Sequence, residues 1–178
     1  MKKAVLLLLL MVAVAASQAQ AKEGFYLGAN LLFNNIGGDI NDLKYGNGLG
    51  LHAGYGLNRY LAFEAGVFKT GNDIKSVGGT AWFKGGTIDA KLTFPLTGSH
   101  MEPYIFGGVG WYKIAYPVQT IEGYGGQLGV GVDIYLFPEL NLSVGLSRRN
   151  INFDATSVFP EKKAKVTTLD IGLTYHFI

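Results

Sequence analysis

The feature that most constrains this chain is an alternation of apolar with polar or small residues at a period of two. Such alternation predicts β-strands with two unlike faces, because a helix repeats its apolar positions every three or four residues. The parity of one segment, 104–114, is ambiguous, and we favour Ile105, Val109 and Trp111 on its apolar face. The strand-like segments are 25–33, 48–57, 60–68, 87–96, 104–114, 127–137, 140–147 and 169–177.

The connections between these segments alternate in length. Tight turns at 58–59 and 138–139 and a moderate one at 97–102 alternate with longer polar stretches. Sequential antiparallel strands then carry every long loop at one end and every short turn at the other, with both chain ends on the short-turn side. The long loops are expected at 34–47, 70–80, 117–124 and 154–164.

Composition indicates which face of the strands meets water. The chain is 48% hydrophobic and only 16% charged, with 26 Gly, whereas soluble domains carry about 25% charged residues and about 7% Gly. A soluble barrel of the lipocalin type would place Lys, Glu and Gln on its wetted outer face, but the less apolar face here carries Gly, Ser, Thr and Asn. This favours a lipid-facing exterior around an interior crowded with small residues.

The predicted fold class is therefore all-β, an eight-stranded antiparallel up-and-down transmembrane β-barrel. Closure is required because lipid cannot satisfy an open sheet edge. Aromatic residues near the strand ends predict girdles at the two membrane interfaces. We expect Phe25, Tyr55, Tyr60, Phe94, Tyr104, Tyr135, Phe137, Tyr175 and Phe177 at the short-turn end, and Trp82, Phe83, Trp111, Tyr112 and Tyr116 nearer the long loops.

The first 21 residues predict a secretory signal peptide. Lys2 and Lys3 precede the apolar run 4–16, and Ala19 and Ala21 form the small-residue cleavage pattern. A membrane anchor is the alternative, but the run is shorter than the roughly 20 residues of a spanning helix. Cleavage leaves the barrel domain, 22–178, in which basic and acidic residues balance, so no nucleic-acid partner is expected. The chain has no Cys, which excludes thiolate metal sites and a Cys nucleophile.

The last strand carries a family resemblance. The segment 170–178 is similar to the terminal signal of bacterial outer-membrane barrels, with Asp170, Gly172, Tyr175 and Phe177 in its four places. Ile178 departs from that signal by following the final aromatic residue. Together with the eight segments and the signal peptide, the chain resembles the small OmpA/OmpX-like outer-membrane β-barrel family. The resemblance implies recognition by the barrel assembly machinery, a bacterial outer-membrane location and periplasmic termini.

Charged residues on the less apolar face predict a network inside the barrel. An eight-stranded barrel is just wide enough for its own side chains, and charges there must be paired or hydrogen-bonded. We interpret the network as a structural plug, and a gate that admits ions or small solutes is the alternative. Its predicted members are Glu64, Asp89, Lys91, Asp133, Arg149 and Asp170, with His52 and His176 nearby.

Catalysis and metal binding find little support in the sequence. Some eight-stranded outer-membrane barrels modify lipid A, and such a deacylase needs a Ser beside a His. Ser99 and His100 are adjacent, but they are expected in a short periplasmic turn, away from the outer leaflet. No group of Ser, His and carboxylate emerges elsewhere in the sequence. Asp39, Asn41 and Asp42 are closely spaced oxygen ligands that lack a calcium-loop pattern. We therefore expect a non-enzyme with neither cofactor nor metal.

Basic residues at the long-loop end suggest contacts with lipopolysaccharide. Arginine and lysine donate charge-assisted hydrogen bonds to phosphates, although a solvated positive rim is an equally good interpretation. The long loops also suit an adhesive surface whose partner the sequence does not name. We expect a monomer with a structural or surface-interaction role. The candidate lipopolysaccharide contacts are Lys84, Arg148, Lys162, Lys163 and Lys165.

Overall fold

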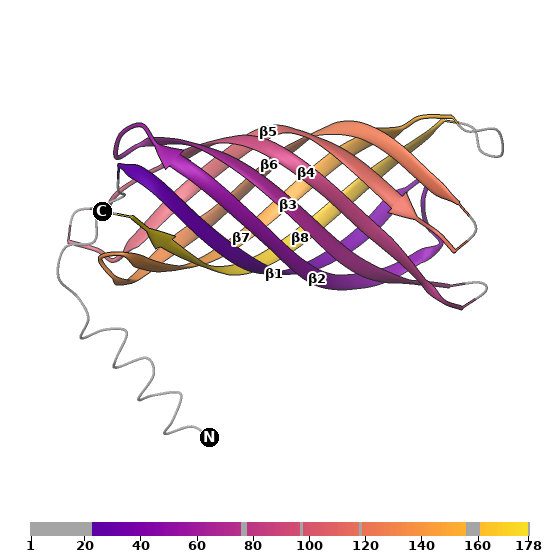
Figure 1. Cartoon of the computed structure of the whole chain (residues 1–178), viewed down its shortest axis with the longest axis horizontal. Helices are drawn as coiled ribbons and strands as arrows, with labels where there is room; N and C mark the ends of the chain where they lie inside the picture. Colours follow the sequence, from indigo (N-terminus) through magenta and orange to yellow (C-terminus); the bar gives the residue numbers. More distant parts are fainter. Residues whose placement is uncertain (1–22, 76–77, 97, 118, 156–160, 178) are drawn as a thin grey trace, which may run out of the picture.

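The eight alternating segments form eight antiparallel strands that close into one barrel, each strand pairing with its neighbours in chain order (Figure 1). The computed structural model describes residues 23–75, 78–96, 98–117, 119–155 and 161–177. Within them there is no helix long and apolar enough to cross a membrane. The predicted fold class is confirmed. The strands are β1 (Gly24–Gly38), β2 (Leu43–Gly56), β3 (Leu61–Ile74), β4 (Thr80–Thr93), β5 (Met101–Ala115), β6 (Thr120–Phe137), β7 (Leu140–Phe153) and β8 (Lys162–His176).

The barrel is staggered, so that a path through paired residues once around it returns to β7 ten residues from where it began. Strands staggered in this way tilt about 35–45° from the barrel axis. Figure 1 shows the strands running obliquely to the long direction of the barrel. The tilt brings Tyr26, near the start of β1, level with Glu64 on β3, to which its hydroxyl donates at 3.0 Å. The path runs from Phe153 through Gly123, Tyr112, Gly85, Phe68, Gly50, Asn30 and Gly172 to Ser143.

One end of the barrel holds the short turns and both ends of the described chain. The start of β1 and the end of β8 lie side by side there (Figure 1), where the Phe177 amide donates to the Phe25 carbonyl at 2.9 Å. The turn between β2 and β3 is stabilised by Asn58, whose side-chain oxygen accepts from the amides of Tyr60 and Leu61 at 2.8 and 2.9 Å. This use of an Asn side chain in a tight turn matches its local hydrogen-bonding preference.

The strands run much further toward the opposite end than the sequence predicted, and the expected loop boundaries were wrong. Residues assigned to loops 34–47 and 70–80 largely belong to β1 to β4, and those assigned to 117–124 and 154–164 include the starts of β6 and β8. The connections between strands there are only 39–42, 75–79, 116–119 and 154–161. The prediction failed because the outward residues of these extensions are polar, so the segments read as loops.

Inward and outward side chains alternate along the whole of each strand. Toward the long-loop end, however, the outward side chains become polar and the inward side chains become apolar. On β7 the outward residues change from Leu146 to Arg148 and beyond, while the inward residues change from Ser147 and Arg149 to Ile151 and Phe153. An apolar exterior suits lipid and a polar exterior suits water. The barrel therefore has a lipid-facing half with a polar interior and a half beyond the apolar band with an apolar core.

The aromatic girdles are real but smaller than predicted. The outward aromatics include Phe25, Tyr55 and Phe177 near the short turns and Trp82 and Trp111 nearer the other end, and each is more than two-fifths exposed. Four expected girdle residues instead point inward and are buried, because their positions have the inward parity of their strands. These are Tyr104, Tyr135, Phe83 and Tyr112. The parity favoured for 104–114 agrees with the structure, since Ile105, Val109 and Trp111 face outward.

Candidate functional site

The polar interior is built around Lys91 on β4. Its ammonium nitrogen lies 2.8 Å from Asp133 Oδ2 on β6 and 3.6 Å from Glu64 Oε2 on β3. All three side chains are at least four-fifths buried. Ser143 on β7 donates a short hydrogen bond to Asp133. The buried cation thus has a carboxylate on each side, which offsets the cost of removing these charges from water.

Two tyrosines complete the surroundings of Lys91. The Lys91 ammonium lies 4.1 Å from the centre of the Tyr104 ring, and the Tyr26 hydroxyl donates to Glu64. The rings cross inward positions occupied by Gly54 and Gly131, where an added Cβ would lie 2.2 Å and 2.4 Å from the tyrosine atoms. Glycine at these two positions is therefore what allows the rings to reach the ion cluster.

A second polar chain lies further along the interior. Gln127 on β6 donates to both carboxylate oxygens of Asp89 at 2.6 Å, and its own side-chain oxygen accepts from Arg149 Nε at 2.8 Å. Arg149 also donates to the Thr168 hydroxyl at 2.6 Å. Arg149 and Asp89 are thus joined through an amide whose donor and acceptor ends match the carboxylate and the guanidinium.

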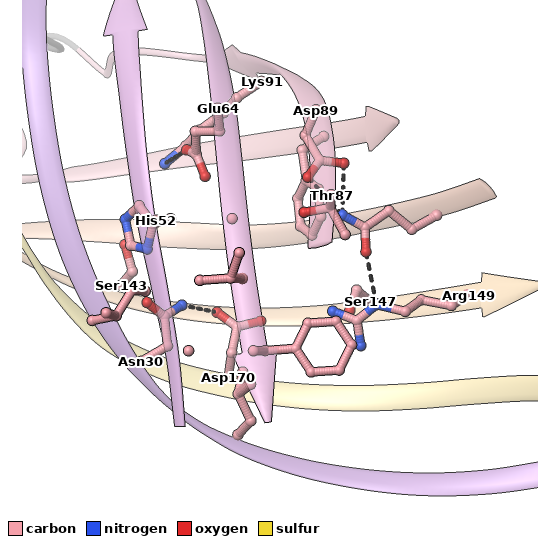
Figure 2. A pocket seen from close by; sticks show the side chains of 18 of the residues that line it. Asn30, His52, Glu64, Thr87, Asp89, Lys91, Ser143, Ser147, Arg149 and Asp170 are labelled. Atoms are coloured by element: carbon pink, nitrogen blue, oxygen red, sulfur yellow. Dashed lines mark hydrogen bonds and ion pairs between the residues drawn. The ribbon is translucent and has the colours of Figure 1, made fainter. Parts of the chain in front are cut away.

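The two polar groups line a cavity of about 100 Å³ inside the barrel. Figure 2 shows Glu64 and Lys91 on one side of it and Asp89 and Arg149 on another. Asp170 also faces the cavity and accepts from the Asn30 amide at 3.4 Å. All six predicted network residues therefore lie inside the barrel, but they form separate groups rather than one ion-pair network. His52 and His176 contact Thr174 and Asn141, each at 3.1 Å.

The apolar core closes the interior on the long-loop side of the cavity. We call it the apolar plug. The sequence pattern had instead predicted an interior filled by small residues. Its side chains come from all eight strands or the ends next to them, and most are less than 2% exposed. Phe83, Ala81, Ile114 and Val166 are fully buried. The plug consists of Ile36, Ile40, Leu43, Ile74, Ala81, Phe83, Tyr112, Ile114, Ile121, Ile151, Phe153, Ala164 and Val166.

Comparison with known proteins agrees with this architecture. Residues 4–177 match the family described as the outer membrane protein beta-barrel domain. The chain belongs to this family. No curated protein matches the chain.

Solved structures share the barrel of this outer membrane protein beta-barrel domain. Neisserial surface protein A superposes with a TM-score of 0.72 at 17% identity, over 87% of this chain and 98% of that one. The attachment invasion locus protein Ail of Yersinia pestis gives 0.59 at 17% identity, over 88% and 100%. OprG, an outer-membrane protein of Pseudomonas aeruginosa, gives 0.54 at 17% identity, over 89% and 98%. At such identities the likeness shows the fold, and the family places the barrel in the bacterial outer membrane.

The connections at the long-loop end of the domain are braced against each other. The Asp39 carboxylate accepts from the Lys163 amide at 2.9 Å, and the Lys75 ammonium donates to the Asn41 carbonyl at 2.7 Å. Asp42 accepts from the Tyr116 hydroxyl at 3.4 Å, and burial together with this carboxylate raises the pKa of Tyr116. The carboxylates of Asp39 and Asp42 and the backbone carbonyl of Asn41 thus each bind a different neighbour. Within the described ranges no group of three or more His, Cys, Asp or Glu is placed to hold a metal.

The candidate lipopolysaccharide contacts fall on two walls of the barrel. Lys84 lies on β4, whereas Arg148 lies on β7 and Lys162, Lys163 and Lys165 lie on β8. Arg148, Lys163 and Lys165 point outward and are exposed, as is Lys84. Lys162 is half-buried. Four of the candidate contacts therefore lie on neighbouring strands, and Lys84 is set apart from them on β4.

The residues of the predicted assembly signal divide between the two faces of β8. Asp170 and Gly172 point inward, and a Cβ on Gly172 would lie 2.8 Å from Asn30 Oδ1. Tyr175 and Phe177 point outward and form an edge-to-face pair with centroids 5.2 Å apart. The cleavage residues Ala19 and Ala21 lie outside the described residues.

Sequence reasoning missed the neutral partners of the interior charges. Gln127, Tyr26 and Tyr104 contact Asp89, Glu64 and Lys91 directly. For Gln127 and Tyr26 the available signal was inward parity, two residues from glycines on the same face, whereas Tyr104 has Glu102 and Phe106 at those places. The plug was missed for a different reason. Most of its residues lie in strand extensions whose polar outward residues made them read as loops, and Phe83 and Tyr112 were expected in the aromatic girdle.

Proposed function

We propose that this protein is a closed outer-membrane barrel that acts through its structure and outer surface rather than by conducting solutes. The observation that carries the proposal is the apolar plug, in which Phe83 and Ile114 are fully buried between the polar cavity and the long-loop end. An ion crossing the lumen would have to shed its water among these side chains. Hydrophobic constrictions stop conduction by excluding water.

Conductance in a planar bilayer tests the proposal. The refolded wild-type barrel should insert without current steps, whereas the variant Phe83→Ala/Phe153→Ala should conduct because it opens space beside the polar cavity. Trp82→Ala is the matched control, since Trp82 neighbours Phe83 but faces outward and is 43% exposed. Steps of the same size from the wild type and the double variant would contradict a closed lumen.

A small gated channel is the second candidate, and the charged cavity favours it. Lys91 between two carboxylates is an ion pair whose rearrangement would open a polar path on the short-turn side. If this candidate is right, wild-type barrels give discrete steps that Glu64→Gln and Lys91→Met alter. If the apolar plug closes the lumen, both variants insert as folded barrels without giving current steps.

The orientation and biogenesis of the barrel form part of the same proposal. The short-turn end, with both ends of the described chain, faces the periplasm, and the long-loop end faces the exterior. The barrel assembly machinery engages β8 through Tyr175 and Phe177, whose outward rings are available to a partner. The barrel acts as a monomer. Protease accessibility of a tag inserted at residue 78 in intact cells tests this orientation, because only an exterior tag is cleaved.

A lipid-modifying activity is not part of the proposal. Ser143 donates to the Asp133 carboxylate inside the barrel and is 5% exposed. A lipid substrate on the outside has no access to it. Mass spectrometry of lipid A from expressing cells should therefore show the same species as the empty-vector control.

A further inference from the structure

The outer face of β7 and β8 changes from apolar to basic at one rung of the sheet. Leu146 pairs with Leu169 on the apolar side of the change, and Arg148 pairs with Thr167 on the next outward rung. Beyond it, the outward residues of the two strands include three cations and no carboxylate. These residues are Arg148, Asn150, Asn152, Lys163, Lys165 and Thr167.

The cations of this face lack partners of the kind that compensate Lys69 and Lys113. On the opposite wall, Lys113 lies 2.7 Å from the Glu122 carboxylate, and the Lys69 ammonium lies 4.0 Å from the centre of the Trp82 ring. In the described part of the chain, no ion pair engages Arg148 or Lys165. Like charges on adjacent strands repel, so this face is arranged for an anion that the protein does not supply.

An external groove runs beside these cations. It has a volume of about 500 Å³ and crosses β7, β8, β1 and β2. Leu146 and Thr167 line it, and they are the neighbours of Arg148 along its strand and across the sheet. Leucine and aromatic side chains form most of its walls, and Asn35, Asn47 and Thr167 add polar groups. The principal lining residues are Phe33, Tyr45, Asn47, Leu146, Thr167 and Leu169.

We propose that this face binds a phosphorylated lipid of the membrane leaflet at the long-loop end. Its phosphate lies against Arg148 and Lys165, and an acyl chain lies in the groove. A guanidinium binds phosphate through two parallel hydrogen bonds. A soluble anion would leave the groove unused, and an uncharged lipid would leave the cations unpaired, whereas a phosphorylated lipid satisfies both. The proposal goes beyond the closed barrel and does not depend on whether the lumen conducts.

Native mass spectrometry of the refolded barrel in detergent tests the site. The probes are lipid A with its two phosphates and the same lipid after enzymatic dephosphorylation. The phosphorylated form should bind, and Arg148→Gln/Lys165→Gln should weaken it roughly thirtyfold, because each basic residue near an anionic surface contributes a factor of about five. The matched control Lys69→Gln/Lys113→Gln removes two outward charges from the opposite wall and should change binding less than about twofold.

A groove variant separates the acyl contact from the charges. Thr167→Trp fills the groove and leaves Arg148 and Lys165 in place, so it should weaken binding of the phosphorylated lipid. Slower gel migration after heating verifies that each variant is folded. The proposal is overturned if the dephosphorylated lipid binds equally well, if the control double variant loses as much affinity, or if a soluble phosphorylated headgroup without acyl chains competes fully.

Discussion

The guanidinium of Arg149 lies 4.8 Å from the centre of the Phe68 ring, and this contact joins the two halves of the barrel interior. On one side, Arg149 is bound to Gln127 and through it to Asp89. On the other, Phe68 packs edge-on against Phe83 of the apolar plug, with centroids 5.0 Å apart. The polar network and the plug are thus in continuous contact along this wall.

Removing the buried cation should destabilise the barrel strongly. Lys91→Met leaves Glu64 and Asp133 buried without their cation, and breaking a buried pair costs about 3–5 kcal/mol. Lys113→Met, in the exposed pair with Glu122, should cost less than about 1 kcal/mol. Urea unfolding from lipid vesicles measures both. Adding Asp133→Asn to Lys91→Met should recover part of the loss, and a double variant no more stable than the single one would contradict this account.

The plug should behave as an ordinary hydrophobic core. Ile151 is 1% exposed inside the barrel, and Ile151→Ala should lower the free energy of unfolding by about 2–5 kcal/mol. Asn152→Ala, one residue later on the outward face, should change it by less than about 0.5 kcal/mol. The same unfolding assay compares the two. Equal small effects would mean that the plug is loosely packed.

Gly172 should be required for barrel closure between β8 and β1. A Cβ there would lie 2.9 Å from the Ala29 carbonyl oxygen as well as close to Asn30, so Gly172→Ala should reduce refolding yield. Gly126→Ala is the control, because its Cβ would meet only the Gly108 carbonyl oxygen at 3.6 Å. The fraction of heat-modifiable protein after refolding gives the readout. A normal refolding yield for Gly172→Ala would show that β1 can shift away from the added Cβ without loss of stability.

The exchange of polarity along β7 should mark where the membrane ends. Val144→Arg places a charge on the outward apolar face and should cost about 2–4 kcal/mol, whereas Asn150→Arg beyond the apolar band should cost about 0–1 kcal/mol. Unfolding from lipid vesicles measures both costs. In lipid-free detergent, which adapts to the protein surface, the difference between the costs of Val144→Arg and Asn150→Arg should become smaller. A large penalty for Asn150→Arg would place lipid along the whole strand.

Much of the fold could be predicted from local patterns. Period-two alternation identifies eight strands, and alternating connection lengths place the ends of β1 and β8 together, because both are properties of neighbouring residues. The inward parity of Glu64, Asp89 and Lys91 was readable for the same reason. The alternation of inward and outward side chains continues along a strand whatever surrounds it.

The sequence by itself therefore determined the number of strands, their order and the alternation of inward and outward side chains along the predicted segments. Only the tertiary structure decided what surrounds each face. Phe83 and Ile151 look like lipid-facing residues along the chain, yet they form a core because the barrel continues beyond the apolar band into water. Likewise, Lys91 meets Glu64 and Asp133 only because the stagger of the closed barrel sets the heights of three separate strands. Closure is a relation among all eight strands, so no single segment encodes it.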